Sequence, residues 1–267
     1  MTVLEPTQPR PASADAGSPR LAADVLRIDS VTKRFGDGPG SVLALDGVSL
    51  RAGRGEFVCV VGASGCGKST LLSLIAGLDR PSAGTVDAHG RTAMMFQEAA
   101  LLPWRTAKAN VELALKLGGV ARADRGERAL ELLDLVRLRE FADKRPHALS
   151  GGMRQRVALA RALAQDADVL LMDEPFGALD AITRDILHDE LERVVSDKGL
   201  TVVFVTHNVR EAARLGDRIV LLSSRPGRVV AEFPVDVPRP RRIEAPDVAA
   251  IASEVTVQLR GEVRRHG

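Results

Sequence analysis

Hydrophobic and polar positions change their period several times along the chain, and each change predicts a new secondary-structure element. Residues 26–36 alternate like a strand, and residues 41–61 contain two or three short strands broken at glycines. Residues 69–78 have the spacing of a helix. Residues 84–97 begin as a turn and continue as a strand that ends at Gln97. The first part of the chain is therefore predicted to be mostly strand, with one helix.

The pattern becomes helical between about 98 and 150. Residues 108–119 and 125–144 both repeat their apolar positions at helical spacing, and little strand signal is present. We therefore expect a helical insert in this part of the chain.

Strands and helices alternate again after the insert. Strands are predicted at 167–175, 200–207 and 217–224, and helices at 180–199 and 208–216. This alternation predicts a mainly parallel sheet that is covered on both faces.

The two ends of the chain differ from the region between them. Residues 1–22 are rich in Pro, Ala, Ser and Gly, and we expect a disordered tail. Residues 236–267 are expected to be a Pro/Arg-rich linker and a surface helix, which leaves 23–235 as the domain. The "RPRR" segment at 239–242 is expected to be solvated, with contact to RNA or anionic lipid as the alternative.

Composition narrows the classes of function. The chain has 267 residues, 45% of them hydrophobic, which suits one large domain with or without an inserted subdomain. A net charge of +2 and an aromatic content of 3%, with no Tyr, argue against a nucleic-acid partner. The 2 cysteines form neither a disulfide framework nor a zinc site and suit a reducing cytosol. No apolar run approaches the roughly 20 residues that span a bilayer, so any membrane role is expected to come through a partner.

The stretch "VGASGCGKST" has the pattern of a phosphate-binding loop between a strand and a helix. Its glycines let backbone N–H groups turn inward around phosphate oxygens. Lys68 is expected to reach the β- and γ-phosphates, and Ser69 to hold Mg²⁺. A chance glycine-rich turn is the disfavoured alternative. The candidate nucleotide-binding residues are Gly62, Ala63, Ser64, Gly65, Cys66, Gly67, Lys68, Ser69 and Thr70.

A second candidate site is the acidic pair at the end of the strand in "DVLLMDEP". Ligands of open α/β sheets lie at the carboxyl ends of the strands. Asp173 is expected to bind Mg²⁺ through water, and Glu174 to orient or deprotonate an attacking water. The alternative is a surface turn with two acids.

The third candidate is "LSGGMRQRVALARAL", in which Ser150 is predicted to cap a helix. Gly151 and Gly152 have no side chains to cover the backbone N–H groups that follow. The apolar stripe of this helix is formed by Met153, Val157, Ala160 and Leu163. It would be a second anion-binding helix start in one chain. One triphosphate does not need two, so we expect this one to serve a nucleotide held by another copy. An ordinary capped helix would explain Ser150 but not "SGG" followed by "RQR".

Together these motifs resemble the ATP-binding subunit of an ATP-binding-cassette (ABC) transporter, over roughly residues 25–225. The family's marks occur in order: the phosphate loop, a glutamine loop at Gln97, the signature at 149–155, the acidic pair, "GALD" with Asp180, and "VTHN" with the switch residue His207. Residues 96–106 and 223–242 further resemble the nitrate/sulfonate/taurine import group.

The resemblance implies an α/β fold of the P-loop NTPase (RecA-like) class, with a mainly parallel sheet core, an N-terminal antiparallel β subdomain and an inserted α-helical subdomain. It also implies a head-to-tail dimer that holds two ATP molecules, each between the phosphate loop of one copy and the signature of the other. The signature contacts would come from Ser150, Gly151, Gly152 and Gln155. Asp180 would link the two sites.

Further roles follow from the same resemblance. Gln97 would contact the metal and the attacking water, His207 the γ-phosphate, and Phe35 the adenine ring, with core packing as the alternative for Phe35. The implied partners are membrane permease subunits at the cytoplasmic face of the cell membrane and, indirectly, a solute-binding protein. Residues 97–105 would line the groove for the permease, with Trp104 either anchoring that partner or covering the insert's own core.

Other classes of function remain as alternatives. A DNA-repair or chromosome-type ATPase would carry long coiled coils or zinc modules inside the domain, and a translation-type ATPase usually fuses two cassettes. A nucleotide-gated binding module without enzymatic activity would be favoured by loss of Glu174 or His207, and both are present.

Overall fold

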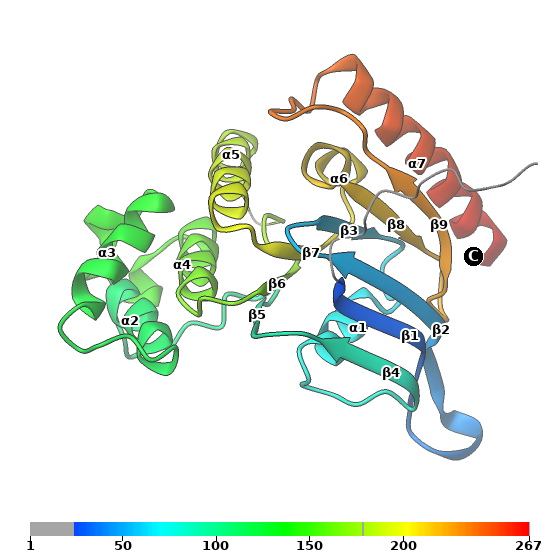
Figure 1. Cartoon of the computed structure of the whole chain (residues 1–267), viewed down its shortest axis with the longest axis horizontal. Helices are drawn as coiled ribbons and strands as arrows, with labels where there is room; N and C mark the ends of the chain where they lie inside the picture. Colours follow the sequence, from blue (N-terminus) through cyan, green and yellow to red (C-terminus); the bar gives the residue numbers. More distant parts are fainter. Residues whose placement is uncertain (1–23, 178, 267) are drawn as a thin grey trace, which may run out of the picture.

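The computed structural model describes residues 24–177 and 179–266 as two β-sheets with helices packed around them (Figure 1). The expected disordered tail, residues 1–22, lies outside the described residues. One sheet is small and antiparallel, and the other is larger and mostly parallel. The helix α1 (Lys68–Ile75) packs between them.

The small sheet has the strand order β2-β1-β4, formed by β2 (Val42–Gly53), β1 (Asp24–Phe35) and β4 (Ala83–Ala88). A 3₁₀ turn, Gly38–Gly40, joins β1 to β2. The prediction of a turn at the start of 84–97 is wrong, because this stretch forms β4 and then β5 (Thr92–Met95), which belong to different sheets. At Gly84, a Cβ atom would lie 2.4 Å from the carbonyl oxygen of Ser30. Only glycine allows β4 to approach β1 so closely here.

The large sheet has the order β5-β6-β7-β3-β8-β9. Its neighbouring strands are parallel except for the last pair, in which β9 runs antiparallel to β8. The strands after β5 are β6 (Val169–Asp173), β7 (Thr201–Thr206), β3 (Phe57–Val61), β8 (Arg218–Leu222) and β9 (Val229–Pro234). The edge strand β9 is not among the predicted elements.

Side chains of the large sheet alternate between two hydrophobic cores. Val58 and Val60 face α1 and the small sheet, whereas Phe57, Cys59 and Val61 face the opposite group of helices. That group includes α4 (Gly151–Leu163), α5 (Ala181–Lys198), α6 (Val209–Leu215) and α7 (Pro246–His266). Burial on both faces explains the nearly continuous apolar strands of the sequence.

Between β5 and β6 the described chain is helical, and Figure 1 shows these helices to one side of the sheets. Asn110 is buried inside this part, where its side chain accepts from the N–H of Leu102 at 2.8 Å and donates to the carbonyl of Thr106 at 2.9 Å. The bounds expected for the insert, 98–150, remain a prediction. The helices before α4 are α2 (Ala107–Leu117), α3 (Arg125–Leu135) and two 3₁₀ turns (Arg139–Phe141 and Pro146–Ala148).

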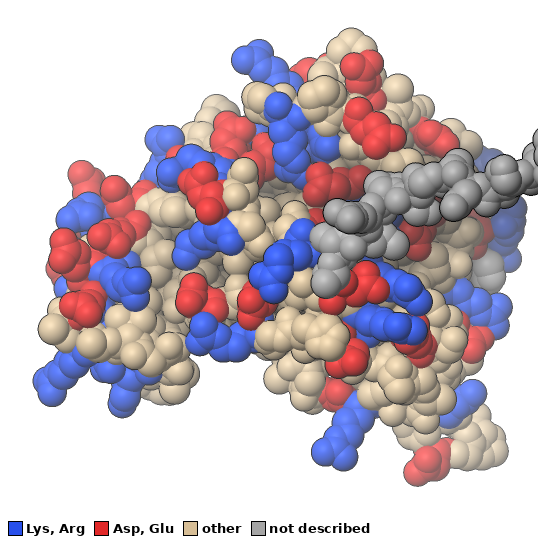
Figure 2. Space-filling model, in the orientation of Figure 1, with Lys and Arg blue, Asp and Glu red and all other residues tan. Residues whose placement is uncertain are grey.

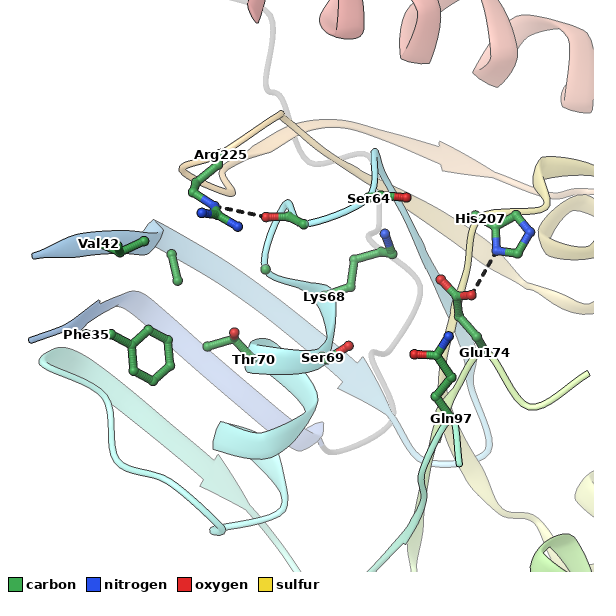
Figure 3. Close-up of a pocket in the computed structure, with 13 residues that line it drawn as sticks. Phe35, Val42, Ser64, Lys68, Ser69, Thr70, Gln97, Glu174, His207 and Arg225 are labelled. Carbon is green, nitrogen blue, oxygen red and sulfur yellow. Dashed lines mark hydrogen bonds and ion pairs between the residues drawn. The ribbon is translucent and has the colours of Figure 1, made fainter. Parts of the chain in front are cut away.

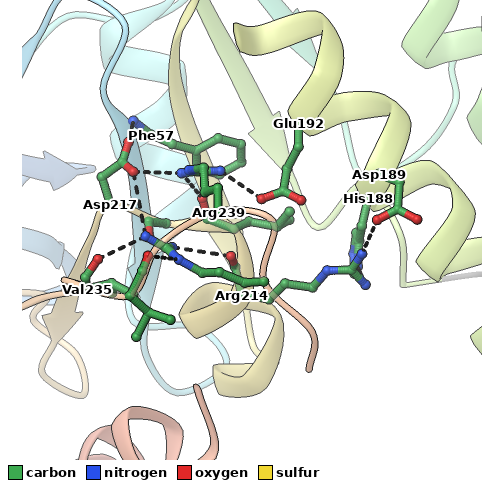
Figure 4. A network of polar contacts seen from close by, with 12 residues as sticks. Phe57, His188, Asp189, Glu192, Arg214, Asp217, Val235 and Arg239 are labelled. Carbon is green, nitrogen blue, oxygen red and sulfur yellow. Dashed lines mark hydrogen bonds and ion pairs between the residues drawn. The ribbon is translucent and has the colours of Figure 1, made fainter. Parts of the chain in front are cut away.

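The expectation of a solvated linker at 239–242 is wrong for two of its arginines. Arg239 lies between Glu192 and Asp217, with N–O distances of 2.8 and 2.7 Å (Figure 4). Arg241 is only 5% exposed and donates to backbone carbonyls that include that of Val235 at 2.9 Å. Arg239 also donates to the carbonyl of Leu215 and Arg241 to that of Arg214, so both side chains hold the C-terminal segment against the domain.

Charge is mixed on the face of the molecule shown in Figure 2. Basic and acidic side chains alternate over the helical part and over the sheets, in keeping with the net charge of +2. This face has no broad basic surface of the kind that binds nucleic acid.

Candidate active site

The phosphate loop, 62–70, connects the buried strand β3 to the start of α1, as predicted. Gly67 caps this helix with φ of 102°, and a Cβ atom there would lie 2.9 Å from the carbonyl oxygen of Ala44. At Gly62 a Cβ atom would lie 2.7 Å from the Sγ atom of Cys66. The glycines are therefore required by close packing of the loop as well as by its conformation.

The loop opens into a cavity of about 590 Å³ (Figure 3). Phe35 and Val42 lie at one end of this cavity, Glu174 and His207 at the other, and Lys68 lies between them. The predicted residues that line it are Phe35, Ser64, Gly65, Gly67, Lys68, Ser69, Thr70, Gln97, Glu174 and His207. Residues of four separate sequence motifs, together with Phe35, are thus brought to a single cavity.

Lys68 is held inside the loop and is only 6% exposed. Its Nζ atom donates to the carbonyl oxygens of Gly62 at 2.9 Å and Ala63 at 3.0 Å. The ammonium charge is therefore fixed at the loop.

Glu174 and His207 form a pair, in which the Oε2 atom of Glu174 is 2.9 Å from Nδ1 of His207. Glu174 has a positive φ of 45°, and its N–H donates to the carbonyl of Val205 at 2.9 Å. A non-glycine residue in this conformation carries backbone strain, and such strain is concentrated at functional sites. The strain here belongs to the residue predicted to activate water.

Asp173 precedes this pair at the end of β6 and is 6% exposed. Burial raises the pKa of its carboxyl group above the ordinary value, although a hydrogen bond from Ser69 opposes that rise. Among the described residues, no basic side chain forms an ion pair with Asp173. The charge of Lys68 and the hydrogen bond from Ser69 only partly offset the cost of burying this carboxylate, because the net shift of its pKa is still upward.

Phe35 is 44% exposed, which excludes plain core packing for this side chain. The Nζ atom of Lys33 lies 4.9 Å from the centroid of its ring. Lys33 is itself held by Asp79 at 2.6 Å, so the ring is fixed from one face.

The signature residues do not line this cavity. Ser150 caps α4 as predicted, because its Oγ atom accepts from the N–H of Met153 at 3.2 Å. Gly151 is exposed and Gly152 is half-buried. Within one chain, the start of α4 is therefore separate from the start of α1, and anion binding at α4 remains a prediction.

The "RQR" of the signature has a role within its own chain, contrary to the expectation that an ordinary capped helix leaves it unexplained. Arg154 donates to the carbonyl of Leu149 at 2.6 Å, and Arg156 to that of Val136 at 3.3 Å. Gln155 is buried and donates to the carbonyl of Gln97. In one chain its amide group thus lies against the glutamine loop, and its expected contact with the nucleotide of another copy remains a prediction.

Asp180 caps α5 and accepts from the N–H of Thr183 at 2.9 Å. This backbone hydrogen bond lowers the pKa of the Asp180 carboxyl group. Within one chain, the Asp180 side chain therefore serves as the cap of α5. The link that it would form between two nucleotide sites remains a prediction.

Arg225 lines the cavity but is absent from the candidates derived from sequence. It lies in the loop between β8 and β9, and its Nε atom donates to the carbonyl of Gly65 at 3.2 Å. The stretch 223–242 was singled out only for its resemblance to an import group and gave Arg225 no role, because the place of Arg225 depends on a loop distant in sequence that folds back onto the phosphate loop.

The sequence is similar to those of proteins in one large family. Residues 45–177 match the family described as ABC transporter. An aliphatic sulfonates import ATP-binding protein of Mesorhizobium japonicum is 44% identical over 265 residues, which cover 97% of this chain and 96% of that protein. The chain belongs to the ATP-binding proteins of ABC transporters.

Other ABC proteins agree in sequence and in structure. A taurine import ATP-binding protein of Rhizobium johnstonii is 46% identical over 90% of this chain and 95% of its own length. A solved bacterial ABC transporter cassette, described as dimeric, covers 80% of this chain with a TM-score of 0.74 and 37% identity. A dimeric post-hydrolysis state of a cassette bound to ADP and Pi matches with a TM-score of 0.73 and 36% identity.

These similarities confirm the predicted family and the predicted P-loop NTPase fold. As an ABC ATP-binding protein, the chain binds and hydrolyses ATP. Across residues 24–177 and 179–266, no helix is both long and apolar enough to cross a membrane.

Proposed function

We propose that this ABC protein hydrolyses ATP to energise the import of a small solute such as a sulfonate, taurine or nitrate. The observation that carries the proposal is the single cavity into which Lys68 and the Glu174–His207 pair open. The solute class is supported by relatives named for the import of aliphatic sulfonates, taurine and nitrate.

The order of residues along the cavity suggests how ATP lies. Phe35 would stack on adenine through its exposed face, since stacking needs only the ring. Lys68 and the backbone N–H groups of 62–70 would hold the phosphates. At the opposite end, Glu174 would orient or deprotonate the attacking water, with Gln97 and His207 near the γ-phosphate.

Mg²⁺ fits the oxygen groups of Ser69 and Asp173, with Gln97 as a further contact. The buried Asp173 carboxylate has no ion-pair partner among the described residues, so a bound cation would offset the cost of burying its charge. No cluster of three His, Cys, Asp or Glu side chains was found in the described chain. That agrees with Mg²⁺, which usually takes one or two protein ligands together with phosphate oxygens and water. When bound, it neutralises charge on the phosphates.

A complete reaction centre would require two copies of the chain. The start of α4, at Ser150, Gly151 and Gly152, offers N–H groups to an anion but lies outside the chain's own cavity. A head-to-tail dimer would place it against the ATP of the partner, with Asp180 near the interface. ATP would favour the closed dimer, and hydrolysis would favour the open one.

Coupling to transport would come through permease subunits, which would hold this protein at the cytoplasmic face of the membrane. The exposed side chain of Trp104, at 68%, favours a partner anchor over the alternative of covering the insert's core. A solute-binding protein would act on the permease and not on this chain.

The dimer is tested by measuring ATP hydrolysis per subunit as the purified protein is diluted. A shared site predicts weak hydrolysis that falls as the concentration falls. A specific activity that stays constant down to nanomolar concentration would exclude the shared site. Co-purification with membrane permease subunits tests the coupling to transport. If no permease co-purifies and DNA or ribosomes stimulate hydrolysis instead, an ABC ATPase that is not coupled to transport is favoured.

A further inference from the structure

The cavity contains a second basic side chain besides Lys68. Arg225 comes from the loop between β8 and β9 and lies on the same side of the phosphate loop as Val42 (Figure 3). Its Nε atom donates to the carbonyl of Gly65, and one hydrogen bond leaves most of the five guanidinium donors free. These donors border the end of the cavity that holds Phe35, away from Glu174 and His207.

The loop that carries Arg225 is built to stay in place. Its Gly227 exchanges backbone hydrogen bonds with β2, donating to the carbonyl of Ala44 at 2.9 Å and accepting from Asp46 at 3.0 Å. A Cβ atom at Gly227 would lie 2.2 Å from the carbonyl oxygen of Cys66, so the loop packs directly on the phosphate loop. Ser223 closes the loop with a 2.7 Å hydrogen bond to the carbonyl of Pro226. The guanidinium is therefore preorganised.

Ion pairing distinguishes Arg225 from Arg228 in the same loop. Arg228 is paired with Asp46, with a distance of 2.9 Å from Nε to Oδ2. Within the described residues, no carboxylate lies within ion-pair distance of Arg225. An arginine that is fixed beside a nucleotide cavity, and has no acidic partner, is suited to a phosphate oxygen.

We propose that Arg225 is a nucleotide-binding residue that contacts the α-phosphate, at the adenosine end of bound ATP or ADP. The inference rests on the proposed function, which puts adenine at Phe35 and the γ-phosphate near Glu174. Because Arg225 lies away from Glu174 and His207, it sets the affinity for nucleotide and not the rate of the chemical step. The contact is the same for ATP and ADP, since both carry the α-phosphate.

The test compares Arg225→Ala with Arg228→Ala in the full chain. Arg228 has the same charge and lies in the same loop but outside the cavity, so its variant is the matched control. The measurements are kcat and KM for ATP hydrolysis, together with Kd values for ATP and ADP from calorimetry. Loss of one charge-assisted hydrogen bond predicts a rise of about tenfold or more in KM and in both Kd values, with kcat within about twofold of wild type. The control should bind both nucleotides as wild type does.

A second variant guards against a folding defect. Arg225→Gln removes the charge but keeps an amide donor for the Gly65 carbonyl, and it should weaken both nucleotides as Arg225→Ala does. The proposal is overturned if both variants bind like wild type, if only ATP is weakened, or if kcat falls while KM is unchanged. If wild-type protein hydrolyses no ATP, the proposed function fails; if it does and the variants match it, only the role of Arg225 fails.

Discussion

At the scale of single residues, Glu174 has a strained backbone and a side chain that lines the cavity. Its φ of 45° and its contact with His207 hold the carboxylate at the end of the cavity. Glu174→Gln keeps the shape of the side chain and removes the base. We expect kcat to fall by about 10²- to 10⁴-fold, while ATP still binds. Steady-state hydrolysis and calorimetry check this, and a variant that retains wild-type kcat would remove Glu174 from the reaction.

We expect the buried carboxylate of Asp173 to lower the stability of the protein while it supports activity. Burial raises the pKa of its carboxyl group in the folded protein. The folded protein therefore loses stability as the pH rises from the pKa of the unfolded chain to that of the folded protein, and the full loss is present above both values. Asp173→Asn removes the charge at nearly constant size. We expect the nucleotide-free protein to gain stability against unfolding and to lose Mg²⁺-dependent hydrolysis. Urea unfolding in the presence of a chelator measures the gain, and a destabilised variant would contradict it.

Some residues of the site could be identified from sequence and others could not. The phosphate loop could be found because its residues are contiguous and their chemistry is local. Arg225 lies 160 positions from Gly65, and only folding brings them together. The hydrogen bond from Gln155 to the carbonyl of Gln97 could not be read from the signature motif either, because it joins residues 58 positions apart.

At the scale of elements, the C-terminal segment is an integral part of the domain. After β9, Arg241 donates to the carbonyl of Arg214 in α6 at 3.3 Å and to that of Gly216, which follows α6. The Pro and Arg residues of this segment led to the prediction of a solvated linker. That prediction was wrong because the sequence does not show which buried carbonyl groups accept hydrogen bonds from Arg241. The strand β9 was missed for a related reason, since an edge strand with one buried face carries a weak apolar signal.

Arg241→Ala tests this attachment. The substitution leaves several buried carbonyl groups without a donor, so we expect a loss of about 3 kcal/mol in the free energy of unfolding. The neighbouring Arg242 is exposed, and Arg242→Ala should change stability by less than about 0.5 kcal/mol. Urea unfolding of both variants measures the difference, and equal stabilities would show that the segment is not fastened by Arg241.

At the scale of the whole molecule, the described chain has two helix starts that are predicted to bind phosphate and that do not open into the same cavity. The start of α1 opens into the nucleotide cavity, and the start of α4 does not. The sequence predicted this mismatch, because one triphosphate does not need two such sites. A twofold dimer resolves it, since each copy then supplies the half that the other lacks.

Two inactive variants can test this arrangement when they are mixed. Lys68→Ala disables the phosphate loop, and Gly151→Glu puts a carboxylate where the partner's phosphate would lie. The fold should tolerate the second change, because a Cβ atom at Gly151 meets only the flexible end of Arg154 at 3.9 Å. Each variant alone should form dimers without an intact site. A mixed dimer pairs the intact phosphate loop of one variant with the intact signature of the other, so mixing should restore part of the wild-type rate. If the mixture stays as inactive as its components, while each variant still dimerises, the two halves do not act across the interface.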